Sequence, residues 1–266
     1  VTGSNDHAFA GAILPDGRII AAGDDYPDEI TVVQVMPDGS LDPSFGTNGK
    51  VLLHQEFVRV SDIALQSDGK VLLAGNELAY TVIRLNPDGT VDTSFGPGGT
   101  ASVNPSAISR GTGSNRTVAI QQIPVGASVE ERIVVGGYVR DKPVGTDRFG
   151  LVRFTSSGSL DTTFGTGGRI SLTFSELRSE MHDLAIDSAQ RIVAVGEAAT
   201  GCTGLDSAYA RFTVNGSVDT SFSGDGKFTH DVYGRDNVAR SVMIAPDGKI
   251  VAVGDAVAST SRRDLA

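Results

Sequence analysis

The sequence has 266 residues, of which 32 are acidic and 22 are Lys or Arg, giving a formal net charge of -10 at pH 7. Proteins that bind nucleic acids or anionic lipid need a cationic surface, and this sequence has no basic block, so both classes are disfavoured. Cys202 is the only cysteine, which excludes an internal disulfide, and no apolar run approaches the roughly 18 residues of a membrane span. We therefore expect no nucleic-acid partner and no insertion into a membrane. Because the chain starts with Val1, we expect it to be a fragment or the mature part of a longer protein.

The chain predicts short β-strands joined by tight turns. After a first apolar run at 8–14, the segment 49–99 shows the full pattern, with apolar runs at 50–53, 61–66, 70–75 and 80–85. Turns carrying Gly69 and Gly89 separate them, and glycine supplies the positive φ that tight turns need. Runs of this length between turn signals predict strands, because no segment keeps a helical apolar period.

Repetition of these strands predicts the fold. The glycine that closes the third strand of the pattern recurs at intervals of about 50 to 60 residues, which suits a four-stranded unit. The expected repeats are 1–48, 49–98, 99–167, 168–225 and 226–266. Residues 71–74 and 192–195 are apolar on both sides of the strand, so both faces of each small sheet are expected to be covered. Stacked sheets of this kind form a β-propeller, and we predict one all-β propeller domain with about five four-stranded antiparallel blades. One strand is expected to be missing at each end, and both a five-bladed ring and an arc of a larger ring are open.

A second motif interleaves with these strands and reads Gly-x-Leu/Val-Asp-x-Ser/Thr-Phe-Gly, with Ser223 in place of the last glycine in the fourth copy. Each aspartate is expected to cap its own turn, since a ring of cation-binding carboxylates is the less economical hypothesis. Each phenylalanine is expected to anchor blade packing. Recurrent arginines are expected to pair with these carboxylates, because a crowded arginine needs a partner. The aspartates are Asp42, Asp92, Asp161 and Asp219; the phenylalanines are Phe45, Phe95, Phe164 and Phe222; the arginines are Arg84, Arg153 and Arg211, with Gln34 in the first copy.

This motif, followed by an Asp-Gly-Lys/Arg-Ile/Val hairpin, resembles the delta-60 repeat family of bacterial β-propellers over nearly the whole chain. Departures are Ala189 and Gln190 in place of Asp-Gly, and an expanded third hairpin at 123–131. The resemblance implies a secreted or cell-surface bacterial protein that is a module of a longer chain, and it implies no particular reaction.

The irregular connections are the expected binding surface. Segments 24–29, 104–116, 138–149, 197–207 and 230–237 vary strongly, and in an up-and-down sheet they emerge at one end. Variable loops on a rigid scaffold are where binding residues usually lie, although tolerated surface loops would show the same variation. The candidate binding residues are Tyr138, Arg140, Arg148, Tyr233 and Arg235, for a protein or glycan ligand.

No catalytic or metal-binding signature is present, and no cofactor is expected. The four histidines lack zinc spacing, there is no nucleophile elbow, and the acidic loop with Asp24 and Glu29 lacks the spacing of an EF-hand, which leaves Ca²⁺ as a lesser alternative. We therefore expect a non-catalytic extracellular binding or scaffold module. The alternative is a propeller lactonase or lyase using a channel site, for which His182 and Asp183 are the pair to examine. A third class is self-assembly through unpaired strands at the chain ends.

Overall fold

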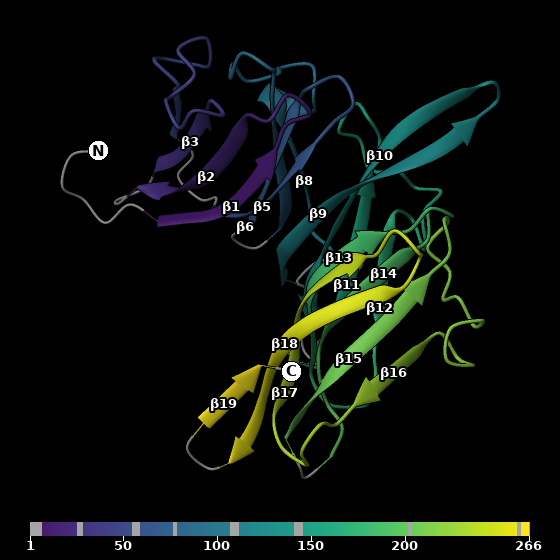
Figure 1. Cartoon of the computed structure of the whole chain (residues 1–266). Helices are drawn as coiled ribbons and strands as arrows, with labels where there is room; N and C mark the ends of the chain where they lie inside the picture. The colour runs from purple at the N-terminus through teal and green to yellow at the C-terminus, as the bar shows by residue number, and fades with distance from the viewer. Residues whose placement is uncertain are drawn as a thin grey trace.

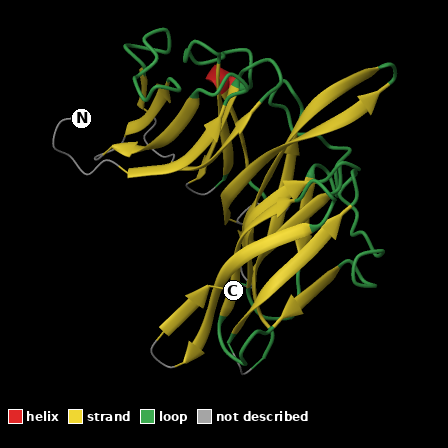
Figure 2. Ribbon diagram, viewed as in Figure 1, coloured by secondary structure: helices red, strands yellow, loops and turns green. Residues whose placement is uncertain are grey.

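The computed structural model describes residues 7–25, 29–54, 59–76, 79–106, 112–140, 146–201, 204–259 and 262–265. These residues form antiparallel sheets joined by turns and one short 3-10 turn, η1 (Pro97–Gly99), as Figure 2 shows. The described part of the chain contains no helix long and apolar enough to span a membrane. Cys202 and the middle of the acidic loop at 24–29 lie outside the described residues.

Five sheets follow one another along the chain. The first contains β1 (His7–Ile13), β2 (Ile19–Asp25), β3 (Glu29–Val35) and β4 (Lys50–His54). The second contains β5 (Arg59–Leu65), β6 (Val71–Asn76), β7 (Tyr80–Leu85) and β8 (Thr100–Val103). The third contains β9 (Thr112–Val125), β10 (Ser128–Arg140), β11 (Asp147–Phe154) and β12 (Arg169–Leu172). The fourth contains β13 (Ser179–Ile186), β14 (Ile192–Ala199), β15 (Leu205–Phe212) and β16 (Lys227–His230). The fifth contains β17 (Asn237–Ile244), β18 (Ile250–Ser259) and β19 (Arg262–Leu265).

Each of the first four sheets takes its fourth strand from beyond the Asp/Phe motif, which differs from the grouping expected from the sequence. The run at 50–53 was expected to start the second blade, yet β4 pairs with β3 through Val32 and Val51. In the same way β8 pairs with β7 through Val82 and Ala101. The expectation of a missing strand at the N-terminal end is therefore wrong, because the first sheet has all four strands. The fifth sheet has three strands among the described residues.

The sheets stack face to face in an arc (Figure 1). The first strands of successive sheets contact one another in the order β1, β5, β9, β13 and β17, and we call these the inner strands. Among the described residues no extensive contact joins β1 to β17, and the first and fifth sheets lie apart in Figure 1. The expanded third hairpin projects as the long β9–β10 pair.

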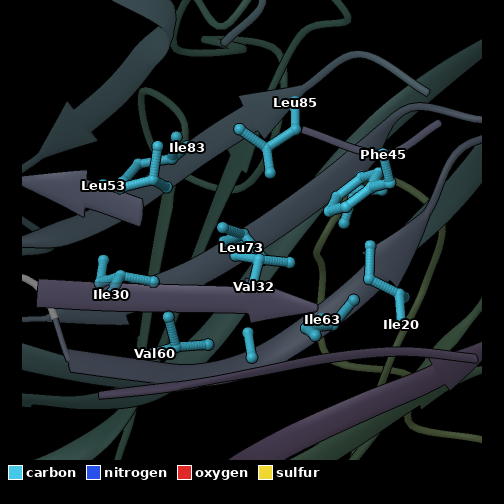
Figure 3. Packing of buried hydrophobic residues seen from close by; sticks show 12 residues of the cluster. Ile20, Ile30, Val32, Phe45, Leu53, Val60, Ile63, Leu73, Ile83 and Leu85 are labelled. Atoms are coloured by element: carbon cyan, nitrogen blue, oxygen red, sulfur yellow. The ribbon is translucent and has the colours of Figure 1, made fainter. Parts of the chain in front are cut away.

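Apolar cores lie between neighbouring sheets, as predicted from the strands that carry apolar residues on both faces. Figure 3 shows the first of them, where Ile20 and Val32 of the first sheet meet Ile63 and Leu73 of the second. Similar clusters join the second sheet to the third, the third to the fourth and the fourth to the fifth. Since burial of apolar surface drives the stacking, each sheet depends on its neighbours for stability.

Candidate functional site

The Asp/Phe motif is a structural joint in every copy. Asp92 accepts hydrogen bonds from the backbone N–H of Ser94 at 3.0 Å and from its hydroxyl at 2.6 Å. The other oxygen of Asp92 accepts a bond from Nε of Arg84 at 2.8 Å. The same capping and pairing recur for Asp161 with Arg153 and for Asp219 with Arg211. The expected capping and Arg–Asp pairing are both confirmed. In the first copy, Arg18 supplies the guanidinium that bonds Asp42 at 2.7 Å.

The first three motifs also fasten their sheets to the next one. The guanidinium of Arg84 lies 4.4 Å from the ring centroid of Phe95 and donates to the carbonyl of Ser156 in the third sheet at 2.6 Å. A Cβ built on Gly158 of that same turn would lie 3.1 Å from the Phe95 ring, so only glycine lets the turn rest on the phenylalanine. Phe45, Phe95 and Phe164 are fully buried, as expected of packing anchors. Residues with such repeated structural roles are poor candidates for a single ligand site.

The inner strands share a second repeated device, a β-bulge opposite the recurrent glycine. The register of β13 and β14 shifts between Met181 and Asp183, which leaves His182 as the extra residue beside Gly196. A side chain on Gly196 would clash with the backbone carbonyl of Glu180. Equivalent bulges lie opposite Gly137 and Gly254. Because a bulge re-aims the side chain of its extra residue, these positions present chemistry that the regular strand would hide.

The bulged residue pairs with the residue after the recurrent glycine in three successive sheets. We call these contacts the rim pairs. In the third sheet the Arg116 guanidinium lies 5.9 Å from the ring centroid of Tyr138. In the fourth, Nε2 of His182 lies 3.2 Å from Oε2 of Glu197. In the fifth, Arg240 donates to Asp255 at 2.8 Å. The backbone geometry repeats while the side-chain chemistry changes, which is the pattern expected of a binding site on a repeat scaffold.

Further charges join the first two rim pairs into one network. Arg116 contacts Glu180 at 3.0 Å across the third and fourth sheets. Arg178 contacts Glu180 at 3.7 Å and makes a short ion pair with Glu197. Burial would raise the pKa of Glu197, but the hydrogen bonds from His182 and Arg178 outweigh it and bring this pKa to about 2. The carboxylates of this network are largely buried and its arginines are exposed. The buried carboxylates therefore fix the position of guanidinium groups that face solvent.

The rim lies at the end of the sheets where the variable connections emerge. Arg116 is near the start of β9 and Tyr138 is near the end of β10, so the connections before β9 and after β10 flank this pair. The variable connections that the sequence predicts at one end of the sheets therefore lead directly into the rim.

The pair His182 and Asp183 does not form a dyad. Asp183 accepts bonds at Oδ2 from the Val242 N–H at 2.8 Å and the Ser241 hydroxyl at 2.7 Å, both in the fifth sheet. Its Oδ1 accepts from Thr117 of the third sheet at 3.0 Å. Asp183 therefore clamps three inner strands together, and the partner of His182 is Glu197.

Asp62 makes a similar clamp between the second and third sheets. It accepts the backbone N–H of Val118 at 2.8 Å, and burial raises its pKa to about 6 despite the bonds it accepts. A buried carboxylate with a raised pKa can mark a functional site, but both oxygens of Asp62 accept backbone bonds, which fits a structural clamp.

The five predicted binding residues fall into two places. Tyr138 and Arg140 lie two residues apart on β10 and so face the same side. Arg140 bonds the buried Asp147 through two nitrogens, each at 2.6 Å. Arg148 follows Asp147 on β11 and points to the opposite face. Tyr233 and Arg235 lie in the connection between β16 and β17, and the ring of Tyr233 is exposed.

Sequence reasoning missed most of the rim. The feature of the sequence that could have revealed the rim is the residue that follows each recurrent glycine, since Tyr138, Glu197 and Asp255 all occupy this position. Its partner could be found only by knowing where the bulge lies. Among the described residues there is no cluster of three or more His, Cys, Asp or Glu side chains arranged to hold a metal ion.

Comparison with known proteins supports the propeller architecture. Residues 14–45, 66–95, 132–164 and 191–222 match a family model described as "Domain of unknown function (DUF5122) beta-propeller". Each matched segment contains a second strand, a third strand and an Asp/Phe motif. No curated protein matches the chain.

Among solved structures, the chain is similar to one described as "Structure of Dos1 propeller", with 13% identity and a TM-score of 0.57 over 94% of this chain and 53% of that one. It is also similar to the extracellular domain of the putative one component system BT4673 from B. thetaiotaomicron, with 12% identity and a TM-score of 0.42 over 95% of this chain and 32% of that one. The chain thus spans about half the length of the Dos1 propeller chain. At this identity the first similarity shows the fold alone.

Proposed function

We propose that the chain is a non-catalytic binding module, extracellular or on the cell surface, that recognises a protein or glycan at the rim. The carrying observation is the contrast between two kinds of repeated position. The Asp/Phe joints keep the same residues and the same contacts in successive sheets, whereas the rim pairs keep their geometry and change their chemistry.

The rim of the third and fourth sheets offers a consistent set of recognition groups. Exposed guanidinium groups of Arg116 and Arg178 supply N–H donors, and the ring of Tyr138 supplies a face for stacking. Glu180 and Glu197 hold these arginines in place, which lowers the conformational entropy lost on binding. Hydroxyl and carbonyl oxygens of a glycan or a peptide suit these donors.

Thermal melting against simple sugars, polysaccharide fragments, Ca²⁺ and Zn²⁺ tests the proposal. A ligand that binds only the folded chain raises the melting temperature. We expect a glycan to raise the melting temperature or, if no glycan does so, we expect the chain to capture a protein partner. In either case Arg116→Ala and Tyr138→Ala should abolish the binding. Tyr233→Ala is the matched control, since it removes an exposed tyrosine from another connection. Loss of binding in Tyr233→Ala alone would move the site to the loop between β16 and β17. A shift with Ca²⁺ alone would instead favour the acidic loop at 24–29.

A second candidate is an enzyme of the lactonase or lyase type, and the observation that favours it is the His182–Glu197 pair. Both side chains are largely buried, and Nε2 of His182 lies 3.2 Å from Oε2 of Glu197, within the reach of a carboxylate that orients an imidazole. Hydrolysis of a lactone panel by the wild-type chain, lost in His182→Asn and retained in Arg240→Ala, would support this candidate. Turnover that is unchanged in His182→Asn would remove the pair from consideration.

A further inference from the structure

Each end of the arc exposes an apolar face that is buried everywhere else in the molecule. The first residue of the second strand shows this at the N-terminal end. Ile19 is 42% exposed, whereas Val71, Ile133 and Ile192, which hold the same position in the next three sheets, are almost completely buried. Among the described residues, no other sheet covers the face of the first sheet that carries Ile19.

On the fifth sheet it is the opposite face that no other described sheet covers. Val251 is 43% exposed and Val253 is 54% exposed. The residues equivalent to Val251 in the four preceding sheets are all buried: Ile20, Leu72, Val134 and Val193. Those equivalent to Val253 include Ala22, Ala74 and Val195, and they are buried as well. Evolution of a solvent-facing sheet surface would favour polar residues at these positions.

The internal joints show what covers such faces. In the first joint, Ile20 and Ala22 of one sheet share a core with Val71 and Leu73 of the next. Figure 3 labels Ile20 and Leu73 in this core. In the third joint, Val134 packs with Ile192 and Ala194 in the same way. Val251 and Val253 correspond to the first member of these joints, and Ile19 corresponds to the second. The two free faces are thus the two halves of the joint that the chain already makes between its own sheets.

We propose that copies of this chain associate head to tail, with the fifth sheet of one copy packed against the first sheet of another. The contact is heterologous, because different faces meet, and such contacts close only if the rotation completes a circle. The similar Dos1 propeller chain is about twice as long as this arc, since the arc covers 53% of it. Two arcs therefore have the extent of one propeller chain, which favours a closed pair over an open fibre.

The joint between copies is weaker than those within the chain. The first three internal joints are fastened by a turn glycine resting on a phenylalanine, but a Cβ built on Gly39 of the first sheet would meet nothing within 4 Å. The described residues after β18 contain no Asp/Phe motif to receive that turn. Two copies also repel each other, because each carries a net charge of -10. Association should therefore depend on concentration and strengthen as salt screens the repulsion.

Sedimentation velocity of the 266-residue chain over a dilution series tests the proposal. We expect the mass to rise toward twice that of one chain. Ile19→Lys and Val253→Lys should each remain monomeric, because each charge disrupts both joints of a closed pair. An equimolar mixture of the two variants should form dimers, since one copy keeps its first-sheet face and the other keeps its fifth-sheet face. Circular dichroism verifies that both variants fold.

Val129→Lys is the matched control. This valine is 62% exposed on the projecting β9–β10 hairpin, away from both end faces, and its variant should associate like the wild type. A wild-type chain that stays monomeric at every concentration and salt would overturn the proposal. So would dimers that persist in both single variants, which would point to edge-strand pairing, or a mixture that fails to dimerise.

Discussion

Phe95 offers a direct test of the joint between sheets. Its ring is fully buried between the Arg84 guanidinium and the turn that carries Gly158. Replacing a fully buried phenylalanine with alanine removes its transfer free energy and leaves a cavity, which together cost about 3–5 kcal/mol. We therefore expect Phe95→Ala to lower the free energy of unfolding by about 4 kcal/mol, measured by urea denaturation.

Phe222 is the matched control, because it occupies the same position in the fourth motif. It lies 4.8 Å from the Arg211 guanidinium, as Phe95 lies beneath Arg84, but it is partly exposed and no following turn rests on it among the described residues. Because part of its surface, less than about a third, is already in water, Phe222→Ala should cost about 1 kcal/mol less than Phe95→Ala, following the proportion between buried area and free energy. In a chain of this size, a difference of about 1 kcal/mol corresponds to about 2–4 °C in melting temperature. Equal losses in the two variants would refute the view that the covering turn stabilises the joint.

Three further predictions concern the inner strands and the rim. Gly196→Ala should lower the free energy of unfolding by at least about 3 kcal/mol, because its Cβ would clash with the backbone. Gly39→Ala, at φ 87° in open space, should lower it by only about 1–2 kcal/mol, the cost of a left-handed backbone for alanine. Urea titration compares the two variants, and equal losses would contradict the bulge argument. The pKa of Asp62 is raised to about 6 when folded, so the folded state binds more protons than the unfolded state. The stability of the wild type relative to Asp62→Asn should therefore fall by about 2 kcal/mol between pH 4 and pH 7; a flat difference would show that burial does not perturb this group. The pKa of Glu197 is lowered to about 2, so its stabilising contribution is present above the ordinary glutamate pKa and is lost as the pH falls toward 2; acid unfolding of Glu197→Gln should lack this component, and an unchanged acid profile would rule it out.

The sequence predicts the local parts of this fold well. Arg84 and Asp92 lie eight residues apart, on a strand and the turn that follows it, so their pairing recurs in three of the four copies and can be inferred from recurrence alone. The capping of Ser94 by Asp92 is more local still. The strands themselves follow from short apolar runs between glycine turns.

What could not be predicted depends on where one sheet ends and the next begins. A repeat has a period but no marked starting point, so the sequence does not tell whether the run at 50–53 belongs with 29–35 or with 59–65. The rim pairs escaped prediction for a related reason. A bulge brings His182 beside Glu197, and neither residue type recurs at its position in the other sheets.

The strand that each repeat lends to the preceding sheet has a consequence for how such chains change in length. Recombination between the near-identical motifs at Asp42 and Asp92 would delete residues 43–92 and bring β8 into the place of β4 beside β3. The first sheet would keep four strands, because Ala101 would pair where Val51 now pairs. Gain or loss of whole units leaves the sheets at the junction with four strands, so a gene of this kind can lengthen or shorten its product in steps of one blade.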